Sequence, residues 1–169
     1  VVPVDSCLIE DQQADAIILT IRSLLKSFKI RTYDEDTGYG LLRHVLIRKG
    51  FTTGELMVCL ILNGTQMPEV KELVNELTKI PGMTSITINV NTKQTNVIMG
   101  QEMRSVWGQD YITDYIGNVK YQISPLSFFQ VNPVQTEKLY ETAVAFAGLT
   151  GKETVLDAYC GIGTIGMVA

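Results

Sequence analysis

The sequence has few of the residues that build metal sites and disulfide frameworks. Its 169 residues include three cysteines, Cys7, Cys59 and Cys160, and one histidine, His44. An odd number of cysteines without a CxxC pair specifies neither a set of disulfides nor a zinc site. This content fits a reducing compartment, so we expect a cytoplasmic protein. The apolar neighbours of Cys59 indicate core packing.

Long apolar runs and an excess of basic residues are also missing. The longest apolar run covers residues 56–62, far short of the ~20 residues with which a helix crosses a bilayer. The net charge is −4, which argues against a free-standing nucleic-acid-binding protein because neutralising phosphates requires clustered Lys and Arg. We therefore expect neither a membrane nor a DNA partner. Any RNA contact would depend on a local patch or on other parts of the protein.

The composition that remains is that of a folded globular chain. Hydrophobic residues make up 46% and charged residues 19%, which argues against disorder. The chain begins at Val1 rather than at methionine, and Val168 and Ala169 end an apolar helix start. We expect a small domain followed by part of another, cut from a longer protein.

Hydrophobic periodicity predicts a mixed α/β organisation over the first two thirds of the chain. Apolar residues three and four apart predict a helix over residues 11–29, and Pro68 opens a second, shorter one. Alternation and turn signals predict strands over residues 41–48, 55–62, 85–90, 103–107, 109–115 and 119–123. We expect one mixed sheet, in which the strand over 85–90 is half-buried.

A third helix is predicted between Asn132 and Gly148, which are suited to its two ends. Its apolar residues on or near one face are Val134, Leu139, Ala143, Phe146 and Ala147. A buried strand is then expected to begin at Glu153 and to feed the glycine-rich segment that follows.

That segment, residues 157–164, is here called the glycine turn. Gly161, Gly163 and Gly166 satisfy the GxGxxG pattern of nucleotide-binding βα units. Asp157, four residues before the first glycine, would repel a pyrophosphate but suits a ligand with an amino group and a sulfonium charge, such as S-adenosylmethionine. Two alternatives remain: a tight turn that binds nothing, and part of an NAD-type oxidoreductase.

Residues 124–132, here called the Phe-Gln loop, form a second informative stretch. Phe128 and Phe129 supply stacking faces, and Gln130 supplies an amide just before a helix begins. Such a loop can hold a flat polar ligand. The alternative, which composition alone favours, is an Asn132 helix cap with both phenylalanines in the core.

Together these stretches resemble the RNA (uracil-5-)-methyltransferase family. The quoted matches are Ser-Phe-Phe-Gln-Val-Asn-Pro at 127–133, Gln-Thr-Glu-Lys-Leu-Tyr at 135–140, Val-Leu-Asp-Ala-Tyr-Cys-Gly-Ile-Gly-Thr at 155–164, and shorter pieces at 5–7, 42–45 and 95–98. The C-terminal block is highly specific, and the likeness runs over nearly the whole chain. Within the family the chain most resembles bacterial 23S rRNA uracil methyltransferases, especially the Gram-positive type.

The resemblance implies an α/β fold and a division of the chain. Residues 1–123 would form a mixed α+β central domain that faces RNA, and residues 124–147 a connector loop and helix. Residues 148–169 would start a Rossmann-like methyltransferase domain, truncated after its first βα unit. The intact protein is expected to be a monomer that acts on 23S rRNA.

The resemblance also implies a methyl-donor site. The residues that it assigns to S-adenosylmethionine are Gln130, Asp157, Tyr159, Gly161, Gly163 and Thr164. Phe128 resembles an aromatic residue near the RNA, where a base flipped out of its stack needs a new partner. Independently, Arg43, with Arg48 and Lys49, suggests an RNA-facing edge. A solvated hairpin tip is the alternative.

In this family a cysteine thiolate adds to C6 of uracil, C5 then accepts the methyl group, and a glutamate removes the C5 proton. The resemblance places both residues after residue 169, so no catalytic residue is expected here and the chain itself should be inactive. Cys160 lies in the donor turn and is not expected to be the nucleophile.

Cys7 resembles the fourth ligand of a 4Fe-4S cluster in many members, but a cubane cluster needs four thiolates. We therefore expect a cluster in the intact protein at most. A further alternative for the chain as a whole is a non-enzymatic RNA-binding module.

Overall fold

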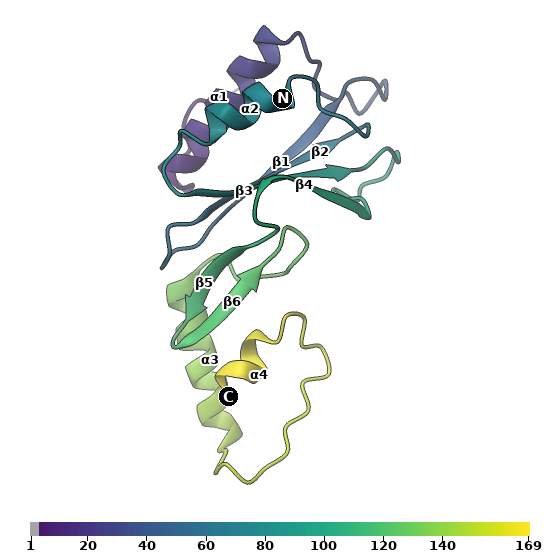
Figure 1. Cartoon of the computed structure of the whole chain (residues 1–169). Coiled ribbons are helices and arrows are strands. Elements are labelled where there is room, and N and C mark those ends of the chain that lie inside the picture. The colour runs from purple at the N-terminus through teal and green to yellow at the C-terminus, as the bar shows by residue number, and fades with distance from the viewer. Residues whose placement is uncertain (1–3) are drawn as a thin grey trace.

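The computed structural model describes residues 4–169, which form two parts stacked end to end (Figure 1). The elements in chain order are α1 (Gln12–Ser27), β1 (Leu42–Lys49), β2 (Leu56–Leu62), α2 (Val70–Leu77), β3 (Met83–Val90), β4 (Glu102–Gly108), β5 (Ile112–Ile116), β6 (Val119–Ile123), α3 (Pro133–Ala147) and α4 (Thr164–Val168). The α/β class predicted from the sequence is confirmed.

The first part is a four-stranded mixed sheet with the order β1-β2-β3-β4, covered on one face by α1 and α2 (Figure 1). β1 and β2 form the predicted antiparallel hairpin, and β2 pairs in parallel with β3. A parallel pair needs a crossover, which α2 provides. The prediction of one continuous sheet is wrong, because β5 and β6 pair only with each other in a separate two-stranded sheet.

α1 packs on the sheet through the stripe that its spacing predicts. Ile17, Ile21 and Leu25 are buried against β2 and β3 in the larger hydrophobic core. Full burial of a side chain of this size contributes roughly 1.5–3 kcal/mol. The helix begins where Asp11 accepts the backbone N–H of Gln13 at 2.9 Å.

β3 is buried on both faces, which corrects the prediction of a half-buried strand. Its alternate polar residues Ser85, Thr87 and Asn89 are as buried as its isoleucines. The Asn89 amide donates to the carbonyl oxygens of Gly100 and Glu102 at 2.9 and 3.1 Å. These two hydrogen bonds compensate the cost of burying the amide, and they also hold the loop before β4.

The second part consists of the β5–β6 hairpin, α3 and α4, around a smaller core. Its buried residues are Met57, Ile112, Ile116, Tyr121, Ile123 and Tyr140. Met57 belongs to β2, so this core also includes a residue of the sheet in the first part.

α3 begins and ends as predicted: Asn132 accepts the N–H of Gln135 at 3.1 Å, and Gly148 has a φ of +59°. Of the apolar residues expected on or near one face, Val134, Leu139 and Phe146 are exposed, whereas Thr136 and Tyr140 are buried. α3 contacts β5 and α4, and its Tyr140 packs in the smaller core and bonds to Thr164 at the start of α4.

A buried carboxylate joins the two parts. Asp114 on β5 is 0% exposed and accepts the backbone N–H groups of Phe51 and Thr52, both at 2.9 Å. In the same turn, Glu55 accepts the N–H of Thr113 at 2.6 Å. These bonds fix the β1–β2 turn against β5.

The strand predicted to begin at Glu153 does not form. Residues 152–157 are extended but unpaired, and Leu156 is 87% exposed. A buried parallel strand needs hydrogen-bonded neighbours and covering helices, and no strand among residues 4–169 pairs with this segment. Across the same residues, no helix is both long and apolar enough to span a membrane.

Candidate functional site

The Phe-Gln loop and the glycine turn meet at one buried side chain, Tyr121 on β6. Its ring lies 5.9 Å from the ring of Phe129, at an interplanar angle of 53°. Its hydroxyl donates to the carbonyl oxygen of Thr164 at 3.0 Å. The two segments that the sequence marked as ligand-binding are therefore neighbours in space.

A second tyrosine holds the same residue of the glycine turn. The Tyr140 hydroxyl on α3 lies 2.8 Å from Oγ1 of Thr164, so both polar groups of this threonine that face the hairpin are hydrogen-bonded. Burial, and then the neighbouring Tyr140, raise the pKa of Tyr121. Tyr121 therefore remains a protonated hydrogen-bond donor at neutral pH.

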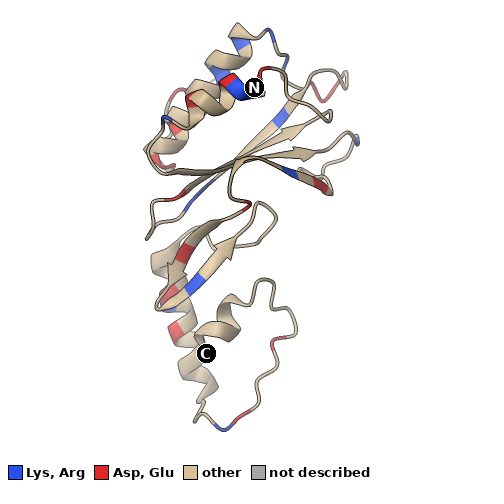
Figure 2. Cartoon of the chain, in the orientation of Figure 1, with Lys and Arg blue, Asp and Glu red and all other residues tan. Residues whose placement is uncertain are grey.

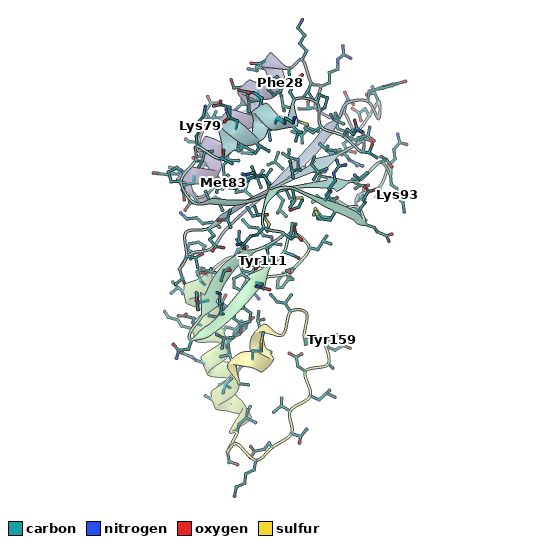
Figure 3. All side chains as sticks on the ribbon, in the orientation of Figure 1. Phe28, Lys79, Met83, Lys93, Tyr111 and Tyr159 are labelled. Atoms are coloured by element: carbon teal, nitrogen blue, oxygen red, sulfur yellow. The ribbon has the colours of Figure 1, made fainter. Side chains whose placement is uncertain are left out.

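The glycine turn adopts a conformation that requires its glycines. Gly161 and Gly163 have φ values of +55° and +80°, in the left-handed region that side chains disfavour. The N–H of Gly163 donates to the carbonyl oxygen of Cys160 at 2.7 Å, and α4 begins at the next residue. Tyr159, near the start of this turn, lies on an outer bend (Figure 3) and is 98% exposed.

Asp157 presents an unused acceptor beside the turn. One carboxylate oxygen accepts the N–H of Tyr159 at 3.3 Å. The other is buried without a hydrogen-bond partner in the part of the chain that the structure describes. A Cβ atom added to Gly166 would lie 3.6 Å from that oxygen. A buried acceptor of this kind is suited to an ammonium or hydroxyl group of a ligand.

The two phenylalanines of the Phe-Gln loop have different environments. Phe129 packs against Tyr121 in the smaller core, whereas Phe128 is 75% exposed. The interpretation of both as core residues is therefore right for Phe129 and wrong for Phe128. Asn132 caps α3, as that same interpretation expected. Gln130 is half-buried next to Phe129.

Arg48, grouped in the sequence with Arg43 and Lys49 as a predicted RNA-facing edge, belongs to this site instead. From β1 its guanidinium donates to the carbonyl oxygens of Ser127 and Pro125, at 2.6 and 3.3 Å. Burial lowers the pKa of this guanidinium from its ordinary value. In the sequence Arg48 was indistinguishable from its basic neighbours, because its loop partners lie nearly 80 residues away.

The predicted RNA-facing edge around Arg43 is not a free basic patch. The Arg43 side chain is 1% exposed, donates to the carbonyl oxygens of Asn91 and Lys93, and lies over the ring of Tyr33 at 4.4 Å. Lys49 pairs with Asp11 at 2.6 Å. Figure 2 shows basic and acidic residues interspersed along α1 and α2. The burial of Arg43 argues against direct contact with RNA.

Comparison with known proteins gives this arrangement a context. The chain is 51% identical over 168 residues to an uncharacterized RNA methyltransferase of Clostridium acetobutylicum, covering 99% of this chain and 36% of the relative. It is 48% identical to an uncharacterized RNA methyltransferase of Halalkalibacterium halodurans, covering 99% of the chain and 37% of the relative. No protein-family model matches the chain.

The chain is similar to one segment of proteins that are named RNA methyltransferases. It spans a little over a third of the length of the curated relatives that it matches.

The fold supports this RNA methyltransferase homology. The crystal structure of the Pyrococcus abyssi tRNA (uracil-54, C5)-methyltransferase, in complex with S-adenosyl-L-homocysteine, matches with a TM-score of 0.81 at 27% identity. The match covers 99% of this chain and 39% of that protein. The relatives give no support to the alternative of an NAD-type oxidoreductase.

The cysteines of this chain lie apart from one another in sequence and environment. Cys7 is half-buried and donates its backbone N–H to Asp15, Cys59 is buried in β2, and Cys160 is exposed in the glycine turn. No group of three His, Cys, Asp or Glu residues within residues 4–169 could hold a metal ion. The iron–sulfur role predicted for Cys7 in the intact protein has no support in these findings.

Proposed function

We propose that the intact protein transfers a methyl group from S-adenosylmethionine to C5 of a uridine in 23S rRNA. The observation that carries this proposal is the meeting of the Phe-Gln loop and the glycine turn at Tyr121, in a chain homologous to RNA methyltransferases. In this proposal residues 1–123 are the central domain, 124–147 the connector, and 148–169 the start of the catalytic domain. We place the activity in the cytoplasm, the compartment of its rRNA substrate.

The residues of the glycine turn fit the methyl donor. The buried, unpartnered oxygen of Asp157 is an acceptor for the donor's amino group. Gly161 and Gly163 leave the turn without side chains, and no atom lies within 4 Å of an ideal Cβ on Gly161. In this proposal Gln130 and Tyr159 complete the site from the loop and from the outer bend. The donor, when bound, supplies a methyl group made electrophilic by its sulfonium.

The chemistry at uracil is assigned to residues outside this chain. Burial raises the pKa of the Cys59 thiol, which makes it a poor nucleophile. Cys160 belongs to the turn that we assign to the donor, so it would face the wrong reactant. We therefore propose that a cysteine elsewhere in the intact protein adds to C6, and that a glutamate removes the C5 proton.

This chain also contributes a surface to the substrate. Phe128 exposes its ring beside the loop that we assign to the donor. A uridine extruded from its stack would need such an aromatic neighbour, and each base–aromatic stack is worth about 1–3 kcal/mol. We propose that Phe128 stacks with the target nucleotide or its neighbour.

A second candidate substrate is tRNA, because the structural neighbour is named a tRNA (uracil-54, C5)-methyltransferase. The test is methyl transfer by the intact protein from donor with a labelled methyl group to 23S rRNA and to tRNA transcripts, separately. Nuclease digestion and mass spectrometry then identify the nucleoside. 5-Methyluridine in 23S rRNA supports the proposal. 5-Methyluridine in tRNA alone would make tRNA the substrate in place of 23S rRNA. If neither RNA is methylated, the proposed methyltransferase activity is overturned.

RNA that carries 5-fluorouridine tests the covalent step. Fluorine leaves C5 without the proton that the base must remove, so the cysteine adduct should persist and migrate as a protein–RNA complex in denaturing gels. Unmodified RNA is the control. Turnover without any trapped complex would exclude the cysteine adduct while leaving the methylation assignment intact.

A further inference from the structure

Two polar groups of Thr164 are hydrogen-bonded to buried tyrosines. Its carbonyl oxygen accepts the Tyr121 hydroxyl at 3.0 Å, and its side-chain hydroxyl is 2.8 Å from the Tyr140 hydroxyl. The resemblance assigned this threonine to the methyl donor. The geometry instead makes it the residue by which the glycine turn is attached to β6 and α3.

The attachment is specific because both tyrosines are buried and come from separate elements. Tyr121 is 2% exposed and Tyr140 5% exposed. The segment before the turn, by contrast, is unpaired and exposed, with Val155 and Leu156 facing solvent. Among the described residues, the two tyrosine hydroxyls hold the glycine turn and α4 in place. Ile162 and Val168 add apolar contacts with the smaller core.

Tyr121 also contacts the other segment of the proposed donor site, the Phe-Gln loop. Its ring contacts Phe129, the residue before Gln130, while its hydroxyl holds Thr164. One side chain therefore contacts both the Phe-Gln loop and the glycine turn. A change at Tyr121 should move both segments relative to each other.

We propose that Tyr121 and Tyr140 are positioning residues, which hold Thr164 and thereby set the glycine turn against Gln130 for donor binding. The inference rests on the proposed function for its ligand. It differs from what the family resemblance implies, because it assigns Thr164 to the protein's own tyrosines rather than to the donor.

A double-mutant cycle in the intact protein separates the two roles of Thr164. Tyr140→Phe and Thr164→Val each remove one hydroxyl of the same hydrogen bond, and each should weaken binding of S-adenosylhomocysteine about fivefold in calorimetry. The double variant should also lose about fivefold, because the bond is lost only once. Thr164→Ser keeps the hydroxyl and should bind as the natural protein does.

Tyr115→Phe is the matched control, since Tyr115 lies half-buried on the neighbouring strand β5 and its hydroxyl has no hydrogen bond within residues 4–169. Its affinity should be unchanged. Losses that multiply to about 25-fold in the double variant would mean that Thr164 contacts the donor independently of Tyr140. That result, or unchanged affinity in both single variants, overturns the proposal.

Hydrogen exchange distinguishes failure of this inference from failure of the proposed function. If the natural protein does not bind S-adenosylhomocysteine, the proposed function fails, and the unliganded protein still tests the attachment. Tyr121→Phe and Tyr140→Phe should each speed exchange at the amides of Gly163 and Met167, which donate hydrogen bonds within the turn and α4. Unchanged exchange at these amides would show that the tyrosines do not position the turn.

Discussion

The guanidinium of Arg48 donates to the carbonyl oxygen of Ser127 at 2.6 Å, and so ties the first strand of the sheet to the Phe-Gln loop. A second bond, to Pro125, holds the same loop at 3.3 Å. Three residues after Ser127 lies Gln130, which we assign to the methyl donor. The sheet and the proposed donor site are therefore coupled through a partly buried cation.

Replacing Arg48 by methionine should destabilise the chain by about 2–3 kcal/mol. The substitution keeps an apolar stem but leaves the carbonyl oxygens of Ser127 and Pro125 without their charged donor. Urea unfolding followed by circular dichroism measures the change. Arg104→Met is a matched control, because Arg104 also donates to a carbonyl oxygen, that of Thr65 at 2.6 Å, but at an exposed position. Equal losses in the two variants would contradict the role of burial.

Asp114→Asn should destabilise the chain by about 2 kcal/mol. The natural carboxylate uses both oxygens to accept the N–H groups of Phe51 and Thr52, whereas an amide offers one acceptor and places an NH2 group against a donor. Exposed Asp110, in the loop before β5, provides the control as Asp110→Asn, which should change stability by less than about 0.5 kcal/mol. A cost for Asp114→Asn as small as that of the control would mean that the two parts are not joined through this carboxylate.

The Asp11–Lys49 pair should contribute stability that depends on pH. The hydrogen bond from Lys49, with that from the Gln13 N–H, lowers the pKa of Asp11 below its ordinary 3.8. A depressed carboxyl pKa stabilises the fold above the unfolded-state value, and this contribution is lost as pH falls through the folded-state value. Since the pair is partly exposed, it should be worth less than about 1 kcal/mol.

Asp11→Asn isolates this contribution, because asparagine still caps the helix. The natural chain should be more stable than the variant at pH 7 in urea unfolding, and the difference should shrink as the pH falls through the lowered, folded-state pKa of Asp11. Raising the salt concentration at pH 7 should shrink it as well. A difference that stays constant from pH 7 to pH 2 would indicate a defect in the cap rather than the loss of the ion pair.

The parts of the fold that sequence predicted are those governed by local patterns. The spacing of Ile17, Ile21 and Leu25 predicted α1, and Asn132 and Gly148 predicted the ends of α3, because a helix stripe and its caps depend on near neighbours. The half-buried β3 was wrong, since Ser85 and Thr87 are polar yet covered on the second face. Only tertiary packing determines that covering.

In the candidate site, too, local features were predicted from the sequence and long-range contacts were not. The glycine turn and the Phe-Gln loop were predicted as ligand-binding from their residues, and the glycines have the positive φ values that such a turn needs. The attachments that position these segments were not predictable. Tyr121 and Thr164 are 43 residues apart, and Arg48 and Ser127 are 79 residues apart, so no local pattern marks them as partners.

Neighbouring Phe128 and Phe129 should separate RNA binding from stability. Phe129→Ala removes a ring packed against Tyr121 and should destabilise the intact protein by about 2–3 kcal/mol in urea unfolding. Phe128→Ala alters an exposed ring, so stability should change by less than about 0.5 kcal/mol. If Phe128 stacks on a base, the same variant should weaken binding of the RNA substrate about tenfold in a filter-binding assay at fixed salt. Phe128→Trp keeps a stacking face and should preserve affinity, whereas RNA affinity unchanged in Phe128→Ala would remove this residue from the proposed RNA surface.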